Sequence, residues 1–178
     1  MRYTFRKAGS LEPGYDDKAA VMLTAQADGS CCAARSDFMS GERKMNLPEV
    51  PAAESNPVIL YFLERDIREM QRLTKGSQNH FRQRIRMAVY SGATVSDVSV
   101  LWRGQAVPAK EIRIQPYLDD PNRPRFTKFA AKEYRFVLSN AVPGGVYAIR
   151  TRIAAEDTAA APLIAEELLV AGGEAAAL

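Results

Sequence analysis

Histidine and cysteine, which supply many catalytic bases and metal ligands in proteins, are scarce in this chain of 178 residues. The single histidine is His80, and the only cysteines are the adjacent pair Cys31 and Cys32. A zinc site needs four ligands at characteristic spacings, and two adjacent cysteines form a disulfide only under strain. The chain also lacks a glycine-flanked catalytic serine and a glycine-rich phosphate loop. We therefore predict no catalytic residue, no metal site and no cofactor.

Long apolar segments are absent as well. The longest apolar run extends from Val58 to Leu63, far short of the roughly 20 residues that cross a membrane. Nevertheless 47% of the residues are hydrophobic, and a chain of this length buries a substantial core. These features predict one soluble globular domain that spans residues 1–178 and has no transmembrane segment. The first residues show no apolar region of a secretory signal, so we expect either a cytoplasmic protein or a mature region.

Positive and negative charges nearly cancel, with a net charge of +3, but bases are concentrated in the middle of the chain. Arg65, Arg68, Arg72 and Lys75 follow one another at steps of three and four residues, which places them on one side of a helix, opposite its apolar side. We call these four residues the basic helix face. Such a face can contact the phosphates of nucleic acids or lipids, but opposite charges four residues apart, as at Glu64 and Arg68, are typical of a solvated helix. Because the net charge is small, a nucleic-acid partner is not expected.

Alternation of apolar and polar residues predicts strands in both halves of the chain. In the first half we predict a strand at Arg2–Lys7, a hairpin whose arms, 18–27 and 30–39, flank the turn Asp28-Gly29, and a further strand at Gly41–Leu47. In the second half the predicted strands are 98–102, 112–114, 134–138, 147–153 and an edge-prone last strand at 163–170. Turn regions are predicted at 104–108 and 143–145, a flexible connection at 154–162 and a frayed tail at 175–178.

Between these regions the apolar residues recur at steps of three and four. Asn56 followed by Pro57 is a typical helix start, and the apolar period continues to Leu73. A second, shorter helix is predicted from Ser77 to Gly92, and one helical turn within 125–132. Strands, then helices, then strands predict an α+β fold. We expect a curved antiparallel sheet of about seven or eight strands, with one long and one shorter helix inserted mid-chain and packed on one face.

Asp66 is the most informative carboxylate, because helical winding places it inside the apolar arc of the first helix. A buried charge needs a partner, which we expect to be an arginine of the sheet or of the second helix; the alternative is a perturbed acid that lines a pocket. His80, near the start of the second helix, is expected to have a surface or capping role. Asp119, Asp120 and Asn122 are explained better by turn formation than by calcium binding.

Aromatic residues of the second half are the candidates for lining an apolar groove between helix and sheet. At these spacings aromatic residues also form an ordinary core, and that alternative stays open. The candidates are Trp102, Tyr117, Phe126, Phe129, Tyr134 and Tyr147.

The segments 56–70, 80–86 and 139–147 together resemble uncharacterised exported proteins of Gram-negative bacteria. The resemblance covers about Asn56 to Ile153. It implies a periplasmic location and a curved sheet that wraps a helix, similar in outline to periplasmic lipoprotein-carrier proteins. It implies no particular functional residue.

The leading hypothesis is a non-catalytic envelope protein that binds a hydrophobic or lipid-like ligand, or a partner segment, in a groove between sheet and helix. The alternative is a protein–protein interaction module that docks through the basic helix face or pairs with the strand at 163–170. A third possibility is an enzyme without a familiar motif, whose pocket would lie around Asp66, Tyr61 or His80. The sequence predicts no oligomeric state.

Overall fold

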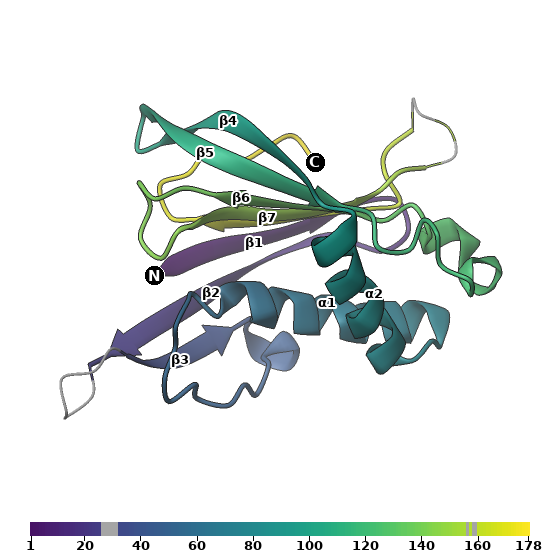
Figure 1. Ribbon diagram of the computed structural model, residues 1–178, viewed down its shortest axis with the longest axis horizontal. Coiled ribbons are helices and arrows are strands. Elements are labelled where there is room, and N and C mark those ends of the chain that lie inside the picture. Colours follow the sequence, from purple (N-terminus) through teal and green to yellow (C-terminus); the bar gives the residue numbers. More distant parts are fainter. Residues whose placement is uncertain (26–31, 156, 158–159) are drawn as a thin grey trace.

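The computed structural model describes residues 1–25, 32–155, 157 and 160–178 (Figure 1). Within these residues the chain forms eight strands and two α-helices. The elements are β1 (Arg2–Ala8), β2 (Tyr15–Thr24), β3 (Ala33–Phe38), α1 (Val58–Thr74), α2 (Gln78–Ser91), β4 (Thr94–Trp102), β5 (Gln105–Ile114), β6 (Glu133–Leu138), β7 (Val146–Ile153) and β8 (Ile164–Val170). Short 3₁₀ helices are η1 (Gly41–Arg43), η2 (Arg123–Arg125) and η3 (Thr127–Phe129).

All described strands belong to one curved antiparallel sheet in the order β3-β2-β1-β8-β7-β6-β5-β4, and the two helices lie on the same side of it (Figure 1). Helix α1 contacts β7, and α2 contacts both α1 and β5. The predicted α+β fold, with two mid-chain helices on one face of a curved sheet, is therefore confirmed.

The helix predictions are also confirmed closely. The backbone N–H of Val58 donates a hydrogen bond of 3.1 Å to Oδ1 of Asn56, so the asparagine satisfies one of the free donors at the start of α1. Helix α2 fills the predicted range from Ser77 to Gly92. The turn Asp28-Gly29 lies outside the described residues, but the arms of its predicted hairpin, β2 and β3, pair antiparallel.

The prediction of an edge strand at 163–170 is wrong. Strand β8 lies between β1 and β7, and each of its residues is buried. Its adjacent carboxylates, Glu166 and Glu167, point to opposite faces, and each meets an arginine: Arg65 on the helix side and Arg150 on the other. Two adjacent glutamates are typical of an exposed strand, which is why the sequence predicted an edge. In the structure both carboxylates are buried and neutralised by ion pairs. The edges of the described sheet are β3 and β4.

Two further strand predictions differ from the structure. The segment Gly41–Leu47 is not a strand, because Met39 and Gly41 adopt positive φ angles of 63° and 54° and turn the chain into η1. The turn between β4 and β5 is shorter than predicted and uses Arg103 and Gly104, also at positive φ. Strand β5 therefore continues through Pro108, which pairs with β4.

The segment after β8 returns along the sheet face opposite the helices (Figure 1). The backbone N–H of Ala176 donates a 3.1 Å hydrogen bond to the Glu167 carboxylate, and the end of β4 pairs with Gly173. Ala176 is thus held against the sheet, within the tail for which we expected fraying. No helix in the described part of the chain combines the length and the apolar character needed to cross a membrane.

Candidate functional site

Most of the aromatic residues predicted to line a groove instead fill the core between helix and sheet. Tyr117, Phe126, Phe129 and Tyr134 are all buried, and Phe81 of α2 joins them. Edge-to-face contacts connect the rings of Phe81, Tyr117, Phe126 and Tyr134, with centroid distances of 5.5 Å for Phe81 and Tyr117 and 6.3 Å for Tyr117 and Tyr134. This cluster occupies the space in which the sequence suggested a ligand groove.

The remaining two aromatic candidates lie elsewhere. Trp102 donates its Nε1 hydrogen to the carbonyl of Ala171 at 3.2 Å. Tyr147 has no partner residue in the pairing of β6 and β7, where the register shifts as at a β-bulge. Its hydroxyl donates to the Leu101 carbonyl at 2.8 Å and accepts the Glu174 N–H at 3.0 Å. The six predicted aromatic residues therefore do not converge on one site.

Asp66 is completely buried and belongs to an enclosed polar cluster. Its carboxylate is bound by the Lys132 ammonium and accepts a hydrogen bond of 2.6 Å from the Tyr134 hydroxyl. The Tyr117 and Tyr134 hydroxyls are 3.0 Å apart. Burial, together with the nearby Asp66 charge, raises the pKa of both tyrosines, so both are hydrogen-bond donors at neutral pH. We call Asp66, Lys132, Tyr134 and Tyr117 the sealed cluster; the expected partner of Asp66 was an arginine, whereas the structure supplies a lysine.

The basic helix face is less uniform than predicted. Arg65 points inward: its guanidinium lies 2.9 Å from Glu166 and 2.5 Å from Glu69, and donates to the Tyr15 hydroxyl at 3.0 Å. Arg68 is exposed and pairs with Glu64 at 3.5 Å. Arg72 is exposed and pairs with Glu12, as described below, and the exposed Lys75 follows the last turn of α1. Three of the four bases are thus engaged by carboxylates. The spacing of four residues predicts the Arg65–Glu69 and Glu64–Arg68 pairs, whereas the contacts of Arg65 with Glu166 and of Arg72 with Glu12 cross between elements and could not be read from the sequence.

Arg65 belongs to a second buried ion cluster, which reaches a cleft. The Lys7 ammonium is bound by Glu69 and lies 2.9 Å from Glu12. Burial alone would lower the pKa of Lys7, but Glu69, Glu12 and Glu166 together outweigh it and raise that pKa. Opposing effects act on Glu166 in the same way: burial would raise its pKa, and Arg65 lowers it. We call Lys7, Arg65, Glu69 and Glu166 the open cluster.

The cleft above the open cluster lies between α1, the segment before β2 and η1. Its volume is about 710 Å³. The lining residues are Lys7, Glu12, Pro13, Tyr15, Met39, Glu42, Arg43, Lys44, Met45, Arg65, Arg68, Glu69 and Arg72. We call it the charged cleft.

His80 connects α2 to the loop after β5. Its Nε2 lies 2.6 Å from Oδ2 of the buried Asp120, and Arg84 approaches the same oxygen at 3.6 Å. Oδ1 of Asp120 accepts the backbone N–H of Asn122 at 2.8 Å, as the turn interpretation of this segment predicts. His80 is therefore a partly buried bridging residue rather than a helix cap.

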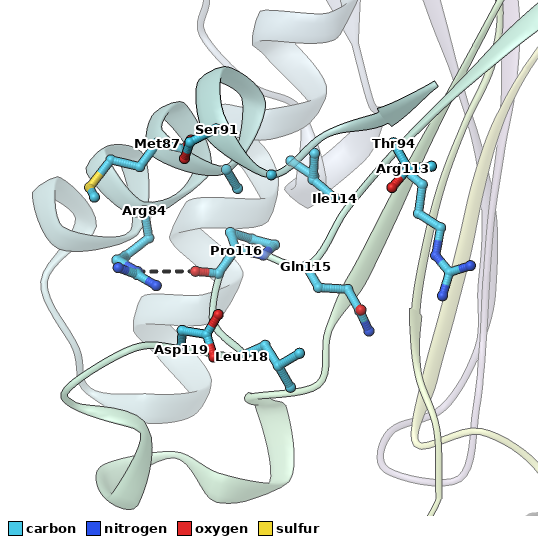
Figure 2. Close-up of a pocket in the computed structure, with 12 residues that line it drawn as sticks. Arg84, Met87, Ser91, Thr94, Arg113, Ile114, Gln115, Pro116, Leu118 and Asp119 are labelled. Carbon is cyan, nitrogen blue, oxygen red and sulfur yellow. Dashed lines mark hydrogen bonds between the residues drawn. The ribbon is translucent and has the colours of Figure 1, made fainter. Parts of the chain in front are cut away.

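A hollow of about 410 Å³ lies beside this bridge, between the end of α2 and the segment after β5 (Figure 2). Arg84 projects toward it, but donates to the Pro116 carbonyl at 3.0 Å, and Ser91 donates to the Met87 carbonyl. Arg84 and Ser91 are thus both engaged by backbone carbonyls. The geometry provides no nucleophile and base within hydrogen-bond distance of each other among the described lining residues.

A largely apolar hollow lies between α1 and α2, on the side of the helices away from the sheet core. Its volume is about 530 Å³. Leu60 is 66% exposed, Val89 47% and Tyr90 85%. The lining residues are Leu47, Pro48, Leu60, Tyr61, Leu63, Glu64, Ile67, Arg82, Ile85, Arg86, Val89 and Tyr90. We call this hollow the interhelical groove.

Two arginines of α2 line the interhelical groove, and they differ in whether a carboxylate pairs with them. Arg82 forms hydrogen bonds of 2.8 to 3.1 Å with the Glu64 carboxylate across the two helices. Arg86 is exposed and has no carboxylate partner among the described residues. Leu60 and Val89 fit the apolar spacing of their helices, which is typical of core residues, so the sequence pattern does not indicate this groove.

The described residues contain no group of His, Cys, Asp and Glu side chains placed to hold a metal ion. Comparison of the chain with protein-family models, with curated proteins and with solved structures found no significant match.

Proposed function

We propose that this is a non-catalytic binding protein whose interhelical groove holds a single-chain amphiphile, meaning an apolar chain with an anionic end group. One observation carries the proposal: large apolar side chains are exposed together in a hollow between α1 and α2, while the interface between helices and sheet is filled. Exposed apolar patches on a protein surface often mark binding sites. The proposed site for a hydrophobic ligand therefore lies on the outer side of α1 and not between α1 and the sheet, where the sequence suggested it.

The shape and charge of the interhelical groove suit such a ligand. Its volume of about 530 Å³ lies within the common range for small-molecule sites. Leu60, Ile67 and Val89 offer apolar contacts along it, and Arg86 offers a guanidinium that no described carboxylate neutralises. A carboxylate end group would accept two parallel hydrogen bonds from that guanidinium. A location in the bacterial envelope remains a prediction.

Binding of dodecanoate, measured by displacement of 1-anilinonaphthalene-8-sulfonate fluorescence, tests this proposal. Val89→Gln adds a polar group inside the groove, and we expect it to weaken dodecanoate binding about tenfold. The matched control is Val95→Gln, since Val95 is similarly exposed, at 56%, but lies on β4 outside the groove. We expect this control to bind as the wild type does.

Arg86→Gln tests the role of the charge. It should weaken dodecanoate binding about tenfold and leave dodecanol binding unchanged, because only the carboxylate pairs with the guanidinium. Absence of saturable dodecanoate binding, or equal loss with Val95→Gln, would overturn the proposal. The interaction-module hypothesis would then be preferred, with docking through the basic helix face of α1, because β8 has no free edge.

A further inference from the structure

We propose that the charged cleft is a binding site for a multiply charged oxyanion, the phosphate or pyrophosphate group of a free small molecule, and that the Glu12 carboxylate occupies its inner position. This site is separate from the interhelical groove, because the two hollows lie on different sides of α1 and share no lining residue. The inference therefore does not depend on the proposed amphiphile.

The geometry around Glu12 is that of an oxyanion site. Nη1 and Nη2 of Arg72 lie 2.7 Å from Oε1 and Oε2 of Glu12, a two-pronged contact. The Lys7 ammonium, itself buried, donates to Oε2 at 2.9 Å. A guanidinium fork combined with an ammonium is a common arrangement for holding phosphates and carboxylates. Glu12 thus supplies from within the chain the group that an anionic ligand would supply from outside.

The residues that line the cleft include more bases than carboxylates. They hold six bases, Lys7, Arg43, Lys44, Arg65, Arg68 and Arg72, against three carboxylates, Glu12, Glu42 and Glu69. Three of these bases also pair with carboxylates outside the lining: Arg65 with Glu166, Lys44 with Asp37 and Arg68 with Glu64. The position of the Glu12 carboxylate, where Arg72 and Lys7 converge, is therefore the part of the cleft that favours an anion.

The backbone that carries Glu12 is fixed, so a competing anion has to displace only a side chain. The N–H groups of Ser10 and Leu11 donate to the carbonyls of Pro162 and Leu163 at 2.9 and 3.1 Å. Gly9 has a φ of 141°, and a Cβ atom there would lie 2.3 Å from the Leu163 oxygen, so only glycine fits. Beyond this anchored segment the Glu12 side chain is 26% exposed, which leaves it open to exchange.

Calorimetric titration with pyrophosphate at low ionic strength tests the inference. We expect wild type to bind pyrophosphate, and Glu12→Ala to bind it at least about tenfold more tightly because the internal competitor is removed. Glu42→Ala is the matched control: it removes the same charge from the same cleft without touching Lys7 or Arg72, and should change affinity less than about threefold. Should Glu12→Ala fail to fold, Glu12→Gln provides the same comparison with the side-chain shape retained.

Two further arms complete the test. Arg72→Gln alters an exposed side chain and should weaken pyrophosphate binding at least about tenfold. Vesicles of phosphatidylglycerol separate a free ligand from a lipid headgroup, and we expect them to bind no better to Glu12→Ala than to wild type. The inference is overturned if neither wild type nor Glu12→Ala binds pyrophosphate, if Glu42→Ala tightens binding as much as Glu12→Ala, or if only vesicles bind.

Discussion

Two buried ion clusters lie beside α1, and they differ mainly in their access to water. In the sealed cluster, Asp66 and Lys132 are enclosed, and the Asp66 carboxylate is further satisfied by Tyr134. In the open cluster, Lys7 and Glu69 are also buried, but Lys7 reaches Glu12 at the charged cleft. Both clusters neutralise a lysine with a carboxylate inside the protein, yet only one of them is adjacent to a space that a ligand can enter.

This difference separates a structural role from a binding role. A sealed ion pair is costly to desolvate, and its benefit lies in fixing one arrangement of α1 against β6. An ion pair at a cleft keeps a partly hydrated partner, so one carboxylate can be exchanged for another anion at small cost. We therefore expect mutations in the two clusters to have different thermodynamic consequences.

The largest effect is expected for Asp66→Ala. This change removes the carboxylate that binds the buried Lys132 ammonium and leaves it the more distant attraction of Glu166, and breaking a buried pair costs about 3–5 kcal/mol. Urea unfolding measures the loss. The double variant Asp66→Leu with Lys132→Met removes both charges and should recover most of the stability. A loss below about 1 kcal/mol for Asp66→Ala would show that water reaches this cluster.

A smaller effect is expected for Glu69→Gln in the open cluster. Lys7 and Arg65 each lose a carboxylate, but Glu12 and Glu166 remain beside them. We expect a loss of about 1–3 kcal/mol in the free energy of unfolding. Glu64→Gln is the control, because Glu64 pairs with Arg68 and Arg82 near the surface and should cost no more than about 1 kcal/mol. If Glu69→Gln costs as much as Asp66→Ala, the distinction between the clusters fails.

The fold could be predicted from the sequence where local signals and long-range packing agree. Asn56 begins α1 because its side chain caps a free N–H, which is a short-range effect. The burial of Asp66 followed from its angle on the helix, and the structure places it fully inside. The prediction for β8 was wrong because strand order depends on pairing with β1, at the other end of the chain, which periodicity does not encode.

The candidate sites were harder to predict, because they depend on which side chains meet across elements. Arg65 has the spacing of a surface residue, and only its contact with Glu166 turns it inward. Leu60 has the spacing of a core residue, and its exposure of 66% reflects the position of α2. Glu12 lies in a loop with no motif, so its contacts with Lys7 and Arg72 could be seen only in the structure.

The smallest expected effect is a dependence of stability on pH that comes from Glu12 in the open cluster. Hydrogen bonds from Arg72, followed by those from Lys7, lower the pKa of Glu12 from 4.5 to about 2. Because the folded-state pKa is the lower one, this contribution is complete above about pH 4.5 and is lost as the pH falls toward about 2. The carboxylate is partly exposed and screened by water, so its size should not exceed about 1 kcal/mol.

Urea unfolding of wild type and Glu12→Gln across this pH range measures that contribution. The stability difference between the two proteins should be constant above about pH 4.5 and should shrink toward zero near pH 2. Arg72→Gln removes the principal cause of the lowered pKa, so in that background the effect of Glu12→Gln should be smaller and should lose most of its pH dependence. A stability difference that stays constant down to pH 2 would mean that Arg72 and Lys7 do not hold Glu12 in solution. The Glu12 carboxylate would then not occupy the anion position in the charged cleft, and the contrast between the open and the sealed cluster would fail.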